Sequence, residues 1–120
     1  MNVAATRRPV LKMRETSLVS ACIQYLTLRG CFVYRQNQGG VKVTRKGRER
    51  LIRFAIVDGI SDIIGMTPSG RYLAVECKVR PNKPTPEQSD FMARVRKSGG
   101  AALLIYSLDE LIAGLKEIGA

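Results

Sequence analysis

The segment Arg71–Arg80, RYLAVECKVR, alternates apolar residues with polar or small ones along its whole length. This period of two predicts a β-strand, with Glu76 and Lys78 on the same face. Ser61–Met66 (SDIIGM) also has the composition of a strand, and the intervening residues 67–70 (TPSG) are typical of a turn. The sequence therefore predicts an antiparallel β-hairpin.

The segments on either side of this hairpin predict further helices and strands. The apolar spacing of residues 14–29 indicates a helix that ends at Gly30, and residues 31–36 (CFVYRQ) indicate a strand. Downstream, TPEQ at residues 85–88 has the pattern of a capped helix N-terminus. The apolar run at residues 101–106 (AALLIY) predicts a strand in the middle of the sheet, and a last helix follows it.

The order helix, strands, helix, strand, helix predicts an α/β fold with a mixed sheet and helices on both faces. The strands at 71–80 and 101–106 should be parallel with a right-handed crossover, because a helix connects them. A length of 120 residues suits one domain. We assign that domain to residues 14–120, after a flexible basic arm at residues 1–13.

The chain is strongly basic, with 20 Lys and Arg against 10 Asp and Glu and a formal net charge of +10. Such an excess favours binding to polyanions, although charge alone does not separate DNA from RNA or from an acidic protein. A segment rich in glycine, predicted as a loop or irregular hairpin, concentrates the cations Lys42, Arg45, Lys46, Arg48, Arg50 and Arg53. We expect DNA contacts there; a solvated loop that keeps the protein soluble would have the same composition.

Histidine is absent from the sequence, which excludes Ser–His–Asp, Cys–His and histidine-base mechanisms. The three cysteines are one short of a four-cysteine zinc site. Cys22 and Cys31 lie among apolar residues and are expected to be buried free thiols. Acid–base or metal chemistry must therefore use carboxylates, lysine, tyrosine or water, and nothing in the chain predicts an organic cofactor.

No segment of the sequence is long and apolar enough to span a membrane, and the N-terminus lacks the apolar core of a signal peptide. We expect no membrane partner. The sequence predicts a cytoplasmic protein, or one that is phage-encoded and acts inside a bacterial host.

Asp62 and Glu76 are the carboxylates that the predicted hairpin can bring together. Asp62 lies at the start of the first strand, and the short turn allows a register in which it lies beside Glu76. Two converging carboxylates repel each other unless a cation lies between them, and Mg²⁺ prefers such oxygen ligands. Lys78 would then orient or deprotonate the attacking water and offset charge on a phosphate. A Glu-x-Lys triplet is also common on solvated strand faces without any catalytic role.

The segments GISDIIG, YLAVECK and TPEQSDFMARVRKSGG together resemble the VRR-NUC family of the PD-(D/E)xK nuclease superfamily, from about Glu15 to Tyr106. In that family a glutamate opens the first helix, and a G-x-P-D segment, an E-x-K strand and a helical glutamine follow. The matching residues are Glu15, Gly59, Asp62, Glu76, Lys78 and Gln88. Ser61 stands in place of the family's usual proline and leaves the aspartate unchanged.

The resemblance implies a restriction-endonuclease-like fold with a metal site. Asp62, Glu76 and the main-chain carbonyl of Cys77 would bind Mg²⁺ or Mn²⁺, and Glu15 would support a second metal or its waters. Gln88 would orient the site or the scissile phosphate. The last two residues also have simpler interpretations, because Glu15 is a favourable anion in a first helical turn and Gln88 completes a helix capping box.

These features predict a Mg²⁺-dependent DNA endonuclease. The resemblance implies selectivity for branched DNA such as Holliday junctions, and a chain this small would cut two strands as a homodimer. Lys83 and Arg80 flank the site and could contact phosphate, or be solvated loop cations. Two alternatives remain open at this point: a basic nucleic-acid-binding module without catalysis, and a sequence-specific restriction-type endonuclease.

Overall fold

The computed structural model describes residues 14–36, 40–53 and 57–120. Its helices and strands, in chain order, are α1 (Glu15–Leu28), β1 (Phe32–Arg35), β2 (Gly40–Arg45), β3 (Arg48–Arg53), β4 (Ile63–Met66), β5 (Tyr72–Cys77), α2 (Pro86–Lys97), β6 (Ala101–Ile105) and α3 (Leu108–Glu117). The basic arm expected at residues 1–13 lies outside the described residues. Within the described ranges, no helix has both the length and the apolar composition needed to cross a bilayer.

Four strands form the main sheet, in the order β1-β4-β5-β6. The pairs β1/β4 and β4/β5 are antiparallel, and β5/β6 is parallel. The predicted hairpin and the predicted parallel pair are therefore both confirmed. The expectation that residues 101–106 form a central strand was wrong, since β6 lies at the sheet edge. Its sequence is apolar because α2 packs on one of its faces and α3 on the other.

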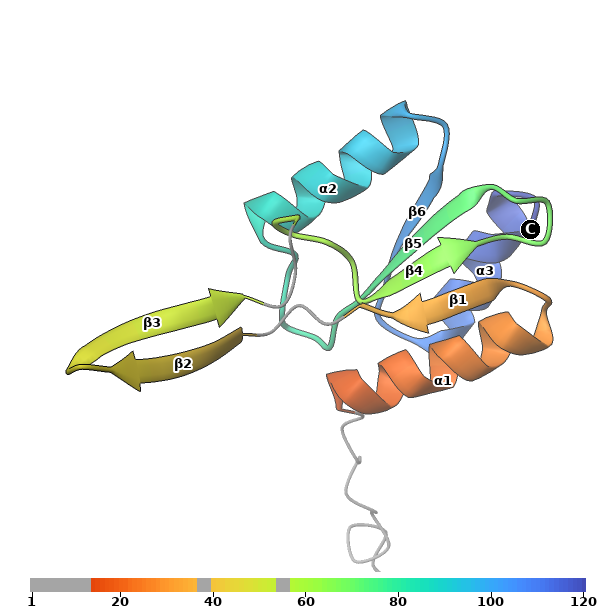
Figure 1. Ribbon diagram of the computed structural model, residues 1–120. Coiled ribbons are helices and arrows are strands. Elements are labelled where there is room, and N and C mark those ends of the chain that lie inside the picture. Colours follow the sequence, from red (N-terminus) through yellow and green to blue (C-terminus); the bar gives the residue numbers. More distant parts are fainter. Residues whose placement is uncertain (1–13, 37–39, 54–56) are drawn as a thin grey trace, which may run out of the picture.

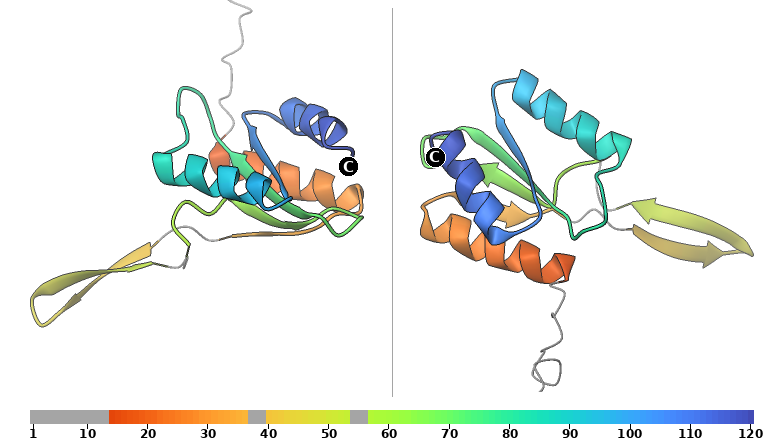
Figure 2. Two further views of the ribbon diagram at one scale, coloured as in Figure 1. Left: turned by 90° about the horizontal axis from the view of Figure 1, so that it is seen from above. Right: turned by 180° about the vertical axis from the view of Figure 1, so that it is seen from behind.

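The helices cover both faces of this sheet, which confirms the α/β fold (Figure 1). On one face, α1 and α3 pack against the alternate residues Leu73, Val75 and Cys77 of β5. On the other face, α2 packs against Ala74 of β5 and Ile64 of β4. Figure 2 shows this layered arrangement from two further sides. The alternate residues of β5 therefore face two separate hydrophobic cores, one on each side of the sheet.

All three cysteines contribute to the core that contains α1 and α3. Cys22, Cys31 and Cys77 are buried and free, as expected for the first two. Burial raises the pKa of the Cys31 thiol, so it packs as a small apolar residue.

Strands β2 and β3 form a separate antiparallel sheet of two strands. The segment expected as a loop or irregular hairpin is therefore a regular β-hairpin, whose turn consists of Lys46 and Gly47. In Figure 1 this hairpin projects from the end of the main sheet where β1 ends and β4 begins.

Candidate active site

Asp62 and Glu76 lie side by side at the end of the main sheet. The register pairs Ile63 of β4 with Val75 of β5. Because the two strands are antiparallel, Asp62, which precedes Ile63, lies opposite Glu76, which follows Val75. The main-chain N–H of Asp62 donates to Oε2 of Glu76 at 3.2 Å, and the main-chain N–H of Cys77 donates to Oδ2 of Asp62 at 2.9 Å. Each carboxylate is therefore held by the other residue's strand.

Lys78 completes a group of three ionisable residues. Its Nζ lies 3.8 Å from Oε1 of Glu76, and only 11% of its side chain is exposed. Its main-chain N–H donates to the carbonyl oxygen of Ile105 at 3.0 Å, which continues the β5/β6 ladder past the end of β5. The sheet therefore fixes the backbone of Lys78 next to the carboxylates.

The carboxylates are costly to ionise in this environment. Burial raises the pKa of Glu76 to about 8, assisted by the charge of Asp62 and opposed by that of Lys78. Burial also raises the pKa of Asp62, although the hydrogen bond from Cys77 opposes that shift. Glu76 has no exposed surface, and its Oε1 accepts no hydrogen bond within the described part of the chain. A cation beside this oxygen would offset the cost of ionisation.

The donor set fits a hard divalent cation such as Mg²⁺. Asp62 and Glu76 supply carboxylate oxygens, which Mg²⁺ and Mn²⁺ prefer, and Oε1 of Glu76 accepts no hydrogen bond from the residues that the structure describes. Among residues 14–36, 40–53 and 57–120, however, no three His, Cys, Asp or Glu side chains group closely enough to hold a metal ion. A metal at this pair would therefore need further oxygens from main-chain carbonyls, water or substrate. Mg²⁺ usually binds in that way.

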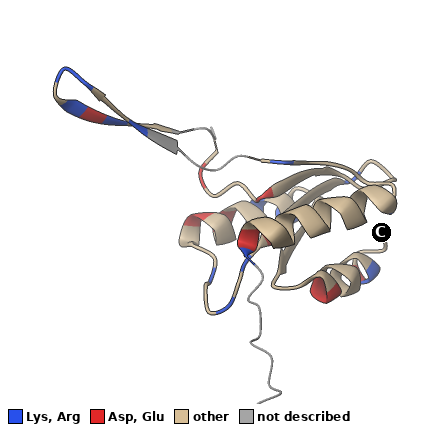
Figure 3. Cartoon of the chain, turned by 90° about the horizontal axis from the view of Figure 1, so that it is seen from below, with Lys and Arg blue, Asp and Glu red and all other residues tan. Residues whose placement is uncertain are grey.

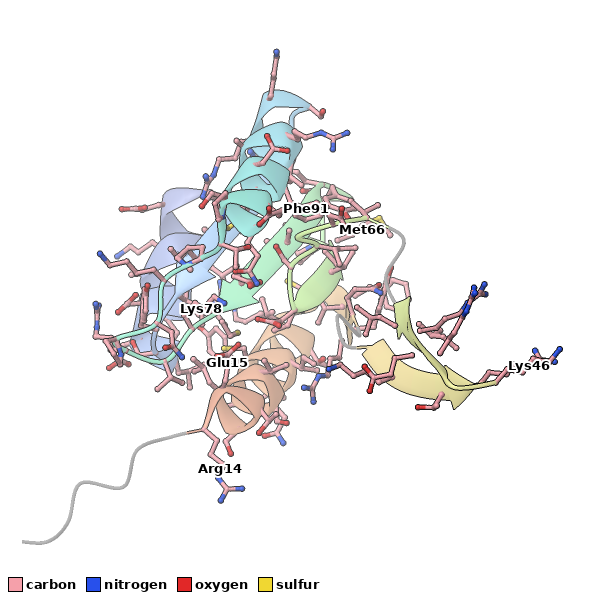
Figure 4. The ribbon with its side chains drawn as sticks, turned by 90° about the vertical axis from the view of Figure 1, so that its left-hand side faces the viewer. Arg14, Glu15, Lys46, Met66, Lys78 and Phe91 are labelled. Atoms are coloured by element: carbon pink, nitrogen blue, oxygen red, sulfur yellow. The ribbon has the colours of Figure 1, made fainter. Side chains whose placement is uncertain are left out.

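Glu15 is the first residue of α1 and is half-buried. The start of α1 lies at the same end of the sheet as the start of β4 and the end of β5 (Figure 1). Figure 4, which looks onto this end, shows Glu15 below Lys78. Glu15 is not part of a cluster of three ligands with Asp62 and Glu76, so any role at the metal would act through water or a second ion.

Gln88 forms the predicted capping box at the start of α2. The Gln88 main-chain N–H donates to Oγ1 of Thr85 at 3.1 Å, and Oε1 of Gln88 accepts from the Thr85 N–H at 2.9 Å. One end of the Gln88 amide is thus committed to helix capping. Its amide nitrogen is the end that could donate to a phosphate.

Gly59 determines how close α2 lies to the site. Its φ is +75°, and a Cβ at this position would overlap the main chain of Glu87 and approach the nitrogen of Gln88 to 2.6 Å. Only glycine permits that contact between the segment before Asp62 and the N-terminus of α2. The sequence matched Gly59 to a family motif, but its packing role has no sequence signal of its own.

Ser61 is the other local feature that sequence reasoning missed. Its side chain is 1% exposed, and its Oγ has no hydrogen-bond partner within the described residues. The Ser61 hydroxyl is therefore a buried polar group directly before Asp62. Such an atom is a position where bound water is expected.

The predicted DNA-binding residues lie in two places. Lys42, Arg45, Lys46, Arg48 and Arg50 are exposed on the β2–β3 hairpin, and the side chain of Arg53 lies outside the described part. Figure 3 shows the cations gathered on the hairpin and at its tip. Lys83 is exposed in the loop between β5 and α2. Arg80 is otherwise engaged, because its guanidinium lies 4.3 Å from the Tyr106 ring centroid and 3.6 Å from Glu110.

Two solved structures are similar to this chain. One, described as "VRR_NUC domain", aligns with a TM-score of 0.57 and 22% identity, over 86% of this chain and 94% of that chain. Another, described as "VRR_NUC domain protein", aligns with a TM-score of 0.54 and 16% identity, over 88% of each chain. No protein-family model and no curated protein matches the sequence. The chain therefore has the fold of these VRR_NUC domains, which confirms the predicted fold.

Proposed function

We propose that this protein is a metal-dependent DNA endonuclease, with Asp62, Glu76 and Lys78 at its active site. The observation that carries the proposal is the fully buried Glu76 carboxylate, whose Oε1 accepts no hydrogen bond from the described residues and lies 3.8 Å from the Lys78 ammonium. A perturbed carboxylate pair beside a lysine is typical of a catalytic site. The shared fold with structures described as VRR_NUC domains supports the same conclusion.

The reaction is hydrolysis of a phosphodiester bond, in which the hydroxyl of water joins phosphorus and its proton goes to the leaving oxygen. Asp62, Glu76 and the main-chain carbonyl of Cys77 would hold the metal. A bound Mg²⁺ or Mn²⁺ would polarise the phosphate and lower the pKa of the attacking water. Lys78 would orient that water and offset negative charge on the phosphate oxygens.

Two further residues would assist from neighbouring helices. Glu15, at the start of α1, would hold waters or a second ion. Gln88 would donate from its amide nitrogen to the scissile phosphate, while its Oε1 remains in the capping box with Thr85. Both roles are positioning roles, and they predict smaller losses of activity than removal of either central carboxylate.

The substrate that we propose is branched DNA, such as a four-way junction, cut by a homodimer. An exposed apolar row supports self-association: Phe32, Met66 and Tyr72 are neighbours across β1, β4 and β5, and are 67%, 42% and 42% exposed. A second copy covering this row would remove it from water and join two sites in one particle.

Light scattering at micromolar protein tests the dimer. Phe32→Lys should give the 13.3 kDa monomer, and a monomeric wild type would contradict the proposal.

The activity is tested with a labelled four-way junction, a matched duplex and a single strand, each with and without Mg²⁺. We expect Mg²⁺-dependent cutting of the junction by the wild type and none by Glu76→Gln, purified in parallel as the control for contaminating nuclease. Salt-sensitive binding without cleavage in Mg²⁺ or Mn²⁺ would instead indicate a binding module. Fragments of fixed length from linear duplex would indicate a restriction-type enzyme.

A further inference from the structure

The β2–β3 hairpin is part of an insertion between Gln36 and Asp62, and a hydrogen bond joins these two residues beside the candidate active site. Beyond the last pair of β1 and β4, the main-chain N–H of Gln36 donates to the carbonyl oxygen of Asp62 at 2.7 Å. The whole insertion leaves and rejoins the sheet at these two residues. Antiparallel neighbours such as β1 and β4 can be joined by a turn of two residues. A long insertion at this point is therefore a candidate for function rather than for completing the sheet.

One face of the hairpin collects cations around an open groove. The residues that line this groove, which we call the basic face, are Val43, Arg45, Lys46, Arg48, Arg50 and Ile52. The register explains the grouping, since Arg45 pairs with Arg48, and Val43 pairs with Arg50. Like charges directly opposite each other destabilise a strand pair. A polyanion in the groove would relieve that repulsion.

The opposite face differs in charge. It carries Glu49, the hairpin's acidic residue, which pairs with Thr44, and it carries Lys42, which pairs with Leu51. A phosphate backbone would be attracted to the basic face and repelled near Glu49. The described cationic side chains are therefore concentrated on one face of the hairpin, a distribution that a positive net charge alone would not produce.

The turn at the hairpin tip also favours a role for its cation. Lys46 has a φ of +51° and Gly47 a φ of +74°, as in a two-residue turn whose central residues both have positive φ. Asn and Gly adopt this conformation readily, whereas a lysine there is strained. Lys46 therefore occupies a position that Asn or Gly would fill with less strain.

From these observations, and on the basis of the nuclease activity proposed above, we infer that the basic face binds the phosphate backbone of duplex DNA next to the scissile bond. A two-stranded β-ribbon fits the major groove of B-DNA, and arginine forms charge-assisted hydrogen bonds with phosphate. Because the inserted segment rejoins the sheet at Asp62, a duplex bound to the hairpin would lie at the end of the sheet that carries the carboxylates. Of the cations that the sequence suggested, Lys42 lies on the opposite face, and Arg53 has a register position on that same face.

The test compares two double variants that remove equal charge, both made in the Glu76→Gln protein so that cleavage does not interfere. Arg45→Gln/Arg50→Gln removes two cations from the basic face. Lys97→Gln/Lys116→Gln removes two cations from the last turns of α2 and α3. Fluorescence anisotropy measures the Kd for a labelled duplex of about 30 base pairs over roughly 50 to 200 mM salt, the range in which counterion release is pronounced.

We expect the hairpin variant to reduce the slope of log K against log salt by about 1.8, at about 0.9 per lost phosphate contact. The helix variant should reduce it by less than about 0.5, since distant charges are screened within about 10 Å. As single changes, Arg50→Gln should reduce the slope clearly more than Lys42→Gln does. These comparisons separate a binding face from a general effect of charge.

Equal slopes for the two double variants would overturn the inference, as would equal effects of Arg50→Gln and Lys42→Gln. Tighter binding of single-stranded DNA or RNA than of duplex would also overturn it. The cleavage assay is independent of these results. If the slopes behave as expected but the wild type cuts nothing, duplex binding by the basic face stands, and the proposed nuclease activity fails together with the placement beside a scissile bond. If the wild type cuts DNA but the slopes are unchanged, the nuclease activity stands and duplex binding by the basic face fails.

Discussion

Nζ of Lys78 lies 3.8 Å from Oε1 of Glu76, a buried oxygen that accepts no hydrogen bond within the described residues. At that separation the ammonium attracts the carboxylate without forming a hydrogen bond. A buried and incompletely satisfied anion is destabilising in a protein interior. The fold therefore holds at this point a carboxyl group that either a proton or a bound cation must neutralise.

Glu76→Gln should abolish cleavage while leaving the fold intact. The amide keeps the size of the side chain but removes the charge that would hold a metal, so we expect the rate to fall by about 10³-fold or more, equivalent to about 4 kcal/mol. Initial rates on the junction substrate measure the loss. Glu117→Gln, which changes an exposed carboxylate in α3, is the matched control, and equal losses in the two variants would contradict the role of Glu76.

The stability of the metal-free protein should fall as pH rises from 4.5 to about 8. Folding raises the pKa of Glu76 from 4.5 to about 8, so the folded state binds the proton more tightly. The stabilisation is complete below pH 4.5 and is lost through pH 8, with a size on the order of a few kcal/mol. Urea denaturation at several pH values measures it.

Mg²⁺ should reverse this loss above pH 8, because it binds the ionised carboxylates of the folded state. Glu76→Gln should remove most of the pH dependence, and the remainder should follow Asp62, whose pKa is shifted in the same direction. A wild type and a Glu76→Gln variant with the same pH profile would show that the buried carboxyl is not the cause.

Lys78→Met should retain metal binding and lose cleavage. Methionine preserves much of the aliphatic chain in the 9% exposed site but cannot orient water or neutralise phosphate. We expect a rate loss of about 10²- to 10³-fold, as for removal of one electrostatic contact in a transition state. Calorimetric titration with Mn²⁺ checks binding separately, and loss of both properties together would mean that Lys78 is needed to form the site.

Gly59→Ala should destabilise the protein more than Gly70→Ala. Both glycines have positive φ, +75° and +84°, so both substitutions strain the backbone by about 1 to 2 kcal/mol. Only at Gly59 would the new Cβ overlap a neighbouring main chain, at Glu87, whereas the space beside Gly70 is open. We expect at least about 2 kcal/mol of additional loss, by analogy with overpacking of a core, measured as the difference in free energy of unfolding. Equal losses would show that α2 moves freely to accommodate the methyl group.

Thr85→Ala and Gln88→Ala separate the two interpretations of Gln88. Each variant breaks the capping box and should lower the free energy of unfolding by about 1 kcal/mol. If Gln88 also contacts the scissile phosphate, its variant alone should lose a further factor of about 10 or more in cleavage rate. Equal rates in the two variants would leave Gln88 with its capping role only.

The elements with strong local patterns were predictable from the sequence. Alternation defined β5, and the capping pattern defined the start of α2, because these signals act within a few residues. The edge position of β6 was not predictable, since an apolar strand covered by helices on both faces has the composition of a central strand. The β2–β3 hairpin was predicted only as a loop or irregular hairpin, because β3 (RERLIR) does not alternate apolar and polar residues.

The residues that form the site were predictable from the sequence, but the burial of their side chains was not. The spacing of Asp62 and Glu76 indicated that they could converge, and the β4/β5 register brings them together. Complete burial of Glu76 depends on the packing of distant segments, which the local sequence does not encode. The same is true of Gly59, whose contact partner lies in α2.

The hydrogen bond between Gln36 and Asp62 has a consequence for how such proteins diversify. A segment whose two ends meet at adjacent positions can be lengthened, shortened or exchanged at little entropic cost, since loop-closure entropy grows slowly with length. The sheet and its carboxylates would be inherited unchanged while the appendage varied. Grafting a different ribbon between these two residues is thus a direct route to new substrate preferences, by engineering or by natural insertion and deletion.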